Sequence, residues 1–214
     1  MKYELIIFDM DGTILDTLED LKNSMNYTLR MFHMPERSLD EIRSFVGNGI
    51  RRLIEQAVVA GTSEDKITEI HKKFMEHYEI HCADFTKPYD GMCELIANLR
   101  KQGYKTAVVS NKADAAVRDL CVQYFPKLFD LAIGEKPDLA RKPAPDMVNL
   151  ALQQLQISKE RAVYVGDSDV DVATAKNSNL DLIAVDWGFR SRECLLAQGA
   201  DIIISHPSEI LELV

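Results

Sequence analysis

The chain has 214 residues, of which 46% are hydrophobic and 28% charged, and it carries a net charge of −9. This composition is that of a folded globular protein and excludes an intrinsically disordered chain. The acidic balance argues against binding to nucleic acid, which requires a basic surface. A protein of this charge that handles phosphate esters needs local positive charge at its site, and a metal ion is the simplest source.

Neither the N-terminus nor the cysteines indicate export. The N-terminal MKYELIIFDMDGT contains a short apolar run interrupted by acids, unlike a signal peptide or a membrane span. The four cysteines, Cys82, Cys93, Cys121 and Cys194, are widely spaced and form no disulfide or zinc pattern. We therefore expect buried free thiols, a cytoplasmic location and no membrane partner.

Residues 17–84 carry the spacing of four helices. Apolar residues recur at every third or fourth position over 18–32, as on the buried stripe of a helix. Ser38 and Glu41 have the spacing of a capping box that opens a second, short helix. The loop Val46-Gly47-Asn48-Gly49 leads into a third helix, and a fourth spans about 64–82.

Strand patterns lie on both sides of this helical segment. ELIIF at residues 4–8 is typical of a buried parallel strand, and strand and helix patterns alternate after Pro88. The later strands are expected at 104–110, 129–133, 161–167, 180–185 and 200–204. The alternation predicts a parallel sheet with helices on both faces. We expect an α/β, Rossmann-like three-layer core with a mostly parallel sheet (residues 1–16 and 85–214), and a four-helix cap domain (residues 17–84) inserted after the first strand.

Acidic residues follow two of the predicted strands, at the edge where ligands bind in such sheets. The first strand ends in Asp9-Met10-Asp11-Gly12-Thr13, in which Gly12 permits a sharp turn and Thr13 can tie its hydroxyl to the loop backbone. The strand at 161–167 ends in the second cluster, GDSDVD. One cluster alone is equally compatible with a solvated turn. Two clusters without histidine or cysteine favour a hard cation with oxygen ligands, such as Mg²⁺.

Two further strand ends supply groups suited to an anion. Ser110-Asn111-Lys112 offers a hydroxyl and backbone N–H groups, which we expect at the start of the next helix. The prolines of RKPAPD hold Lys142 on a stiff support at another helix entrance. Taken alone, the Ser-Asn pair is more often a helix cap and the lysine is more often a solvated surface charge. Four polar groups at successive strand ends together favour a phosphate site.

These four segments resemble the four motifs of the haloacid dehalogenase superfamily, in order and at similar spacing: FDMDGTILDT, VVSNK, RKPAPD and VGDSDVD. The resemblance spans nearly the whole chain, and the helical insert resembles the helical cap of that superfamily. SFVGNGIRRLIEQA, PYDGM and VDWGFR are similar to its phosphoglycolate phosphatase branch. Ser178-Asn179 departs from the Ala-Gly that relatives often have. Asparagine tolerates a left-handed conformation, so this departure concerns local loop geometry.

The resemblance implies a Mg²⁺-dependent phosphatase that forms an aspartyl-phosphate on Asp9. Asp11 would protonate the leaving oxygen and then accept a proton from the hydrolytic water. Asp9, Asp167 and the backbone carbonyl of Asp11 would hold Mg²⁺. Ser110 and Lys142 would bind the phosphoryl oxygens.

The other candidate residues would support this site or bind the substrate. Asp171 is expected behind Lys142, where it orients the ammonium group. Thr13 and Asn111 are expected at the phosphate. In the cap, we expect substrate contacts from Gly47, Asn48, Gly49 and Arg51, because a glycine-rich loop and a helix N-terminus favour an anion and a guanidinium suits a carboxylate. Arg43 and Arg52 are further cap candidates.

The resemblance therefore implies hydrolysis of a small phosphorylated metabolite, foremost 2-phosphoglycolate to glycolate and phosphate. A pyrophosphatase and a broad sugar- or nucleotide-phosphatase are the alternatives. Asp11 favours phosphoryl transfer over dehalogenation, since a halide leaving group needs no proton. A phospho-receiver domain or a non-catalytic phosphate-binding protein is a different class, disfavoured by the chain length and by the filled motifs. The pattern makes no prediction of oligomeric state.

Overall fold

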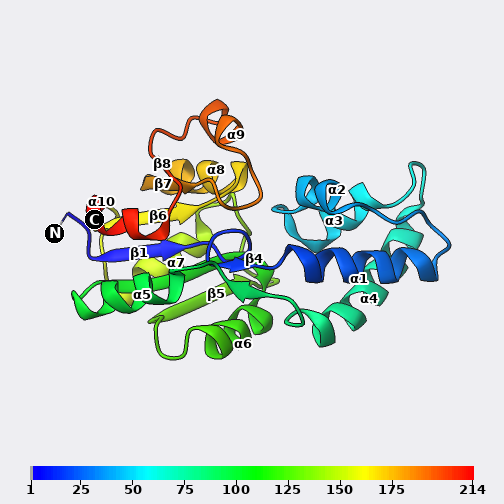
Figure 1. Cartoon of the computed structure of the whole chain (residues 1–214), viewed down its shortest axis with the longest axis horizontal. Coiled ribbons are helices and arrows are strands. Elements are labelled where there is room, and N and C mark those ends of the chain that lie inside the picture. Colours follow the sequence, from blue (N-terminus) through cyan, green and yellow to red (C-terminus); the bar gives the residue numbers. More distant parts are fainter. Residues whose placement is uncertain (1) are drawn as a thin grey trace. The chain divides into compact units, whose positions relative to one another are not determined.

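The computed structural model describes residues 2–214 and divides into two compact units. The core unit comprises Met1–Leu15 and Pro88–Val214, and the cap unit comprises Asp16–Lys87. Figure 1 traces both in sequence colours. Over residues 2–214, no helix combines the length and the apolar character that crossing a bilayer requires.

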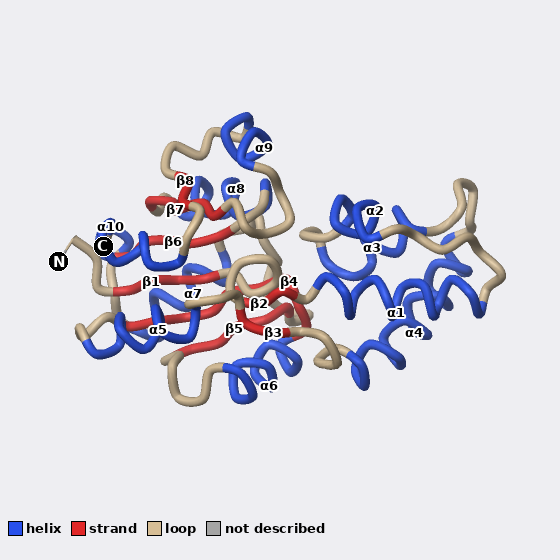
Figure 2. The backbone as a smooth tube through the Cα atoms, in the orientation of Figure 1, coloured by secondary structure: helices blue, strands red, loops and turns tan. Residues whose placement is uncertain are grey.

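The core unit is built on a parallel sheet of six strands in the order β5-β4-β1-β6-β7-β8 (Figure 2). The strands are β1 Leu5–Phe8, β4 Lys105–Ala113, β5 Leu131–Glu135, β6 Ala162–Gly166, β7 Asp181–Val185 and β8 Ile203–Ile204. This confirms the predicted α/β, Rossmann-like class. The chain passes from β1 to β4 on one side and later returns to β6 on the other. The switch point, where ligands bind in such sheets, therefore lies at the carboxyl end of β1.

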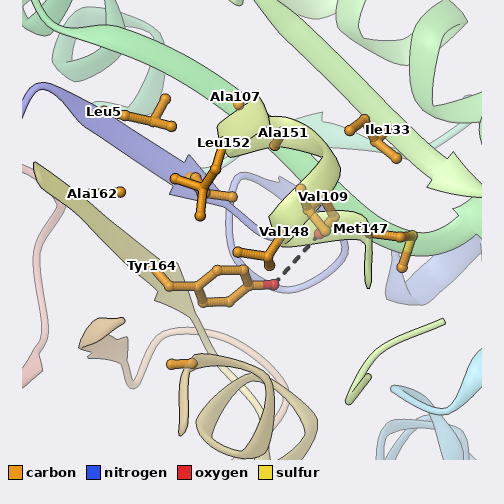
Figure 3. Packing of buried hydrophobic residues seen from close by; sticks show 12 residues of the cluster. Leu5, Ala107, Val109, Ile133, Met147, Val148, Ala151, Leu152, Ala162 and Tyr164 are labelled. Atoms are coloured by element: carbon orange, nitrogen blue, oxygen red, sulfur yellow. Dashed lines mark hydrogen bonds between the residues drawn. The ribbon is translucent and has the colours of Figure 1, made fainter. Parts of the chain in front are cut away.

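Helices cover both faces of this sheet. They are α5 Met92–Lys101, α6 Asp114–Tyr124, α7 Asp146–Leu155, α8 Asp169–Ser178, α9 Arg192–Ala197 and α10 Ile210–Leu213, with 3₁₀ turns at Lys159–Arg161 and Pro207–Glu209. Leu5, Val109 and Tyr164 lie on one face, in a buried cluster with residues of α7 (Figure 3). On the other face Phe8 meets the edge of Phe129, which follows α6. Because side chains alternate along a strand, burial on both faces explains the continuous apolar runs in the sequence.

The cap unit consists of α1 Leu18–Met31, α2 Leu39–Phe45, α3 Gly49–Ala57 and α4 Glu64–His81. Each helix buries one apolar stripe, as its spacing predicts, and the capping box at Ser38 is formed with Glu41. The two points where the chain passes between the units lie in a short sheet of β2 (Leu15–Asp16) and β3 (Lys87–Pro88).

Two local expectations are wrong. β4 does not end at residue 110 but continues to Ala113, with a break in its register to β5 after Val109. Ser110-Asn111-Lys112 therefore lies in an irregular strand end and not at a helix start, since α6 begins at Asp114. The prediction of buried thiols is right for Cys121 and wrong for Cys82, Cys93 and Cys194, which are half-buried.

Candidate active site

The loop after β1 turns sharply and directs Asp9 and Asp11 to the switch point. The N–H groups of Ile14 and Leu15 both donate to the carbonyl of Met10, at 3.0 Å each, which closes the turn. Gly12 has φ +88°, and a Cβ added there would lie 2.4 Å from Oδ2 of Asp167. Position 12 thus requires glycine for two reasons: the backbone is left-handed there, and the Asp167 side chain leaves no room for a Cβ.

Asp167, directly after β6, is held by two other loops. Thr13 Oγ donates to its Oδ1 at 2.7 Å, and the Phe189 N–H donates to its Oδ2 at 2.8 Å. The Thr13 hydroxyl therefore donates to a carboxylate, and the predicted bond from this hydroxyl to the loop backbone is wrong. Trp187 Nε1 donates to the Thr13 carbonyl at 3.0 Å. The loop after β7 is a support that sequence reasoning did not assign, although it follows a strand end as the other motifs do.

Lys142 lies at the centre of a buried charge cluster. Its Nζ is 2.8 Å from Oδ1 of Asp9 and 2.8 Å from Oδ1 of Asp171. Asp171 is itself fixed, because its Oδ2 accepts bonds from the backbone N–H and the hydroxyl of Ser168 at the start of α8. The ammonium group is therefore aimed at Asp9 by a carboxylate that the helix cap holds in place.

Tyr164 joins this cluster to the hydrophobic core, and sequence reasoning missed it. Its ring packs among the buried residues of β1, β4 and α7 in Figure 3, where its hydroxyl reaches the carbonyl of Val109. The same hydroxyl accepts from Lys142 Nζ and donates to Asp171, at 3.0 Å each. A tyrosine in an apolar strand gives no sequence signal of such a role, since its partners are distant in the chain.

The irregular end of β4 contributes three side chains. Ser110 is buried, and Asn111 Nδ2 donates to the carbonyl of Lys142 at 3.0 Å, which fixes the turn that carries the lysine. Lys112 is also buried, and its Nζ lies 3.0 Å from Oδ1 of Asp11. The site therefore contains two lysines, of which sequence reasoning assigned only Lys142.

Burial dominates the electrostatics of the site. It raises the pKa of Asp9 to about 7, with a further increase from the charge of Asp171 and an opposing effect of Lys142. Burial likewise raises the pKa of Asp167 well above its usual range. Burial would lower the pKa of Lys142, but Asp171 and Asp9 outweigh it and raise that pKa. The lysine is thus held as a cation.

A divalent cation fits this donor set. Asp9, Asp167 and Asp171 are all buried, and each offers an oxygen within 4.8 Å of the others. Each oxygen of Asp171 accepts two hydrogen bonds, whereas each oxygen of Asp167 accepts one, so Asp9 and Asp167 are the carboxylates that keep lone pairs for a metal. With Asp11, four carboxylates meet two lysines, which leaves two negative charges when all are ionised. One Mg²⁺ with oxygen ligands would balance them.

Comparison with known proteins agrees with this arrangement. The sequence-family model of the haloacid dehalogenase-like hydrolases matches residues 6–185, and this range includes all four strand-end motifs. The chain belongs to the haloacid dehalogenase-like hydrolase family. It is 30% identical to a phosphoglycolate phosphatase of Aquifex aeolicus, covering 98% of this chain and 96% of the relative. It is also 30% identical to an N-acetylmuramic acid 6-phosphate phosphatase of Pseudomonas aeruginosa, covering 100% and 96%.

A solved structure from Lactobacillus delbrueckii subsp. bulgaricus, described as a candidate phosphoglycolate phosphatase, superposes with a TM-score of 0.95. It is 36% identical and covers 100% of this chain and 98% of that one. The likeness spans both units of this hydrolase, so the two chains share the same order of elements.

The predicted substrate-binding residues of the helical insert all lie in the cap unit. Gly47 and Gly49 have φ of +119° and +79°, and α3 starts at Gly49. Arg51 pairs with Glu55 and Glu64, Arg43 with Asp40, and Arg52 with Glu55. A separate hollow of about 580 Å³ lies between α1, the segment after it and the end of α4. Neither Arg43 nor residues 46–52 line this hollow, so the loop and the three arginines do not belong to it.

Proposed function

We propose that this hydrolase is a Mg²⁺-dependent phosphatase that cleaves a small phosphate monoester, foremost 2-phosphoglycolate, through an aspartyl-phosphate on Asp9. The observation that carries this proposal is the convergence of Asp9, Asp11, Lys142 and Asp167 at the switch point of one sheet. The set provides a nucleophile, an acid, a fixed cation and a metal ligand, which together are what phosphoryl transfer needs.

In the first step, Asp9 attacks phosphorus in line with the leaving oxygen. The bond from phosphorus to the ester oxygen breaks as the bond to the Asp9 carboxylate forms, and Asp11 donates a proton to the departing oxygen. Lys142 and Ser110 bind the phosphoryl oxygens, and Lys142 is already aligned by Asp171 and Tyr164.

In the second step, water attacks the phosphorus of the aspartyl-phosphate. Asp11, now ionised, accepts a proton from that water, and cleavage of the acyl-phosphate bond frees phosphate and restores Asp9. One residue thus serves as acid and then as base, which requires that its carboxyl remain accessible. The side chain of Asp11 is 17% exposed, compared with 0% for Asp171.

Asp9, Asp167 and the backbone carbonyl of Asp11 are the groups that we propose to hold Mg²⁺. When bound, the ion would offset repulsion between the carboxylate of Asp9 and an anionic phosphate. Without a cation, raised pKa values of Asp9 and Asp167 partly discharge the cluster, so protons and metal compete for the same oxygens.

The choice of 2-phosphoglycolate is supported by relatives of that activity and by the cap segments that resemble that branch. Gly47, Asn48, Gly49, Arg51, Thr13 and Asn111 remain the predicted substrate contacts. The relative that acts on N-acetylmuramic acid 6-phosphate favours a second candidate, a phosphatase for larger sugar phosphates. Both candidates share the chemistry at Asp9 and differ only in the leaving group.

A phosphate-release screen over small phosphorylated metabolites tests the proposal. We expect release from 2-phosphoglycolate with Mg²⁺, loss after chelation, and recovery when Mg²⁺ is restored. Asp9→Asn should abolish turnover, since an amide is a poor nucleophile. Asp11→Asn should abolish turnover while phosphate-analogue binding persists. Full activity after exhaustive chelation, or near-normal hydrolysis of an alkyl phosphate by Asp11→Asn, would contradict these assignments.

A further inference from the structure

Lys112 is a buried cation that the proposed steps do not use. Its side chain is 4% exposed, which is rare for a lysine and costly unless the ammonium group has a defined partner. One partner in this structure is Oδ1 of Asp11, at 3.0 Å. The question is therefore what Lys112 contacts when a substrate occupies the site.

We propose that Lys112 binds an anionic group on the leaving alcohol and so selects phosphate esters that carry a carboxylate next to the ester oxygen. This assignment rests on the proposed function, and it places a determinant of substrate choice on β4 in the core unit.

The position of Lys112 relative to Asp11 carries the argument. To donate its proton, Asp11 must lie within about 3 Å of the ester oxygen. With the proton on Oδ1, Lys112 Nζ, 3.0 Å from that atom, lies at most about 6 Å from the ester oxygen. A carboxyl carbon two bonds beyond the ester oxygen lies roughly 2.5 Å from it, so a carboxylate that points toward Lys112 can bring its oxygens within hydrogen-bond reach of Nζ.

The two lysines have different surroundings, which separates their roles. Lys142 is held among Asp9, Asp171 and Tyr164, on the side where phosphorus is attacked. Lys112 contacts the residue that protonates the departing oxygen. One cation is thus assigned to the phosphoryl group and the other to the group that leaves.

The arginines of the cap are weaker candidates for the same carboxylate. Arg43, Arg51 and Arg52 have 41%, 41% and 55% exposed side chains, and each pairs with a carboxylate of the cap unit. Exposed ion pairs of this kind are screened by water and ions. A substrate carboxylate bound by buried Lys112 is screened much less, and an ammonium-to-carboxylate bond of this type contributes more.

The test compares phosphate esters of three two-carbon alcohols whose far group is anionic, neutral or cationic: 2-phosphoglycolate, ethyl phosphate and 2-aminoethyl phosphate. In the wild type, kcat/KM should fall in that order. Lys112→Met should lower the ratio of kcat/KM for 2-phosphoglycolate to that for ethyl phosphate by roughly 10- to 100-fold, the range for one charge-assisted hydrogen bond. Lys112→Arg should restore part of the ratio. Each ratio comes from one preparation, so partial unfolding of a variant cancels.

The matched control is Lys176→Met, which removes an exposed lysine of α8 and should leave the ratio unchanged. If Lys112→Met lowers kcat/KM equally for all three esters, Lys112 only positions Asp11 and the assignment is wrong. An unchanged ratio in Lys112→Met, with loss of the ratio in Arg51→Ala, would move the determinant to the cap. No release from any of the three esters would overturn the proposed function itself, and this assignment with it.

Discussion

At the scale of single residues, Asp9 is under opposing demands. A nucleophile should be ionised, but burial raises its pKa from 3.8 to about 7, with the charge of Asp171 adding to the effect. An acid whose pKa is higher in the folded state binds protons more tightly there than in the unfolded chain. In the metal-free protein its contribution to stability therefore increases as the pH falls from 8 through about 7 toward 4, and is lost as the pH rises.

We therefore predict that metal-free wild type unfolds at a lower temperature at pH 8 than at pH 6, and that Asp9→Asn removes part of this difference. The displacement of the pKa is equivalent to roughly 4 kcal/mol at most. Asp9→Asn should thus raise the Tm at pH 8 by several degrees. Thermal unfolding in excess chelator measures it, with Asp119→Asn, an exposed acid of α6, as control. An equal slope of Tm against pH in wild type and Asp9→Asn would contradict the prediction.

Substitution of Tyr164 tests whether the ammonium group of Lys142 must be held in a fixed position as well as charged. Tyr164→Phe keeps the ring in the core and deletes the hydroxyl that contacts Lys142 and Asp171. We expect about 1 kcal/mol of lost stability and a several-fold decrease in kcat, because the ammonium loses one of its fixed contacts.

The control for this substitution is Tyr104→Phe, a buried tyrosine just before β4 at the opposite end of that strand from the site. It should leave kcat unchanged. A Tyr164→Phe enzyme with wild-type kcat and KM would show that the hydroxyl only satisfies a buried partner.

At the scale of elements, the loop after β1 depends on the approach of the loop after β6. Gly12→Ala should reduce activity and Mg²⁺ affinity severely, because the added Cβ would lie 2.4 Å from Oδ2 of Asp167 and φ is +88°. Gly103→Ala separates these two causes. Gly103 has φ +92° but has no atom within 4 Å of an added Cβ.

Both variants should lose about 1 kcal/mol to backbone strain, and only Gly12→Ala should lose activity. Steady-state kinetics and thermal unfolding of the pair measure this. If Gly103→Ala is equally inactive, strain in loops and not the contact with Asp167 would be the cause.

At the scale of the whole molecule, metal binding should be coupled to stability. The proposed Mg²⁺ would bind the folded carboxylates and not the unfolded chain. The ion should therefore stabilise the fold by about 2.7 kcal/mol at 100 times its Kd, and Tm should rise with its concentration. Asp167→Asn removes a proposed ligand and should abolish most of the increase. An equal increase in wild type and Asp167→Asn would mean that the ion binds elsewhere.

The sequence by itself determined the order of elements and the position of the four motifs. Hydrophobic periods predicted the α/β core and the helices of residues 17–84, because local burial patterns repeat at 2.0 or 3.6 residues whatever the tertiary contacts. The strand-end rule placed Asp9, Lys142 and Asp167 at one edge of the sheet. It could not show that β4 continues to Ala113, since a break in register depends on the neighbouring strand.

Only the tertiary structure decided which side chains support the site. Tyr164 looks like a core residue, Lys112 like a surface charge and Trp187 like part of a loop. Each acquires its role from a partner in another element or loop: Asp171 and Lys142 for the tyrosine, Asp11 for the lysine, and Thr13 for the tryptophan. Local sequence carries no record of such contacts. Burial also sets the charge state of the cluster, because desolvation acts on side chains only after the strands have assembled around them.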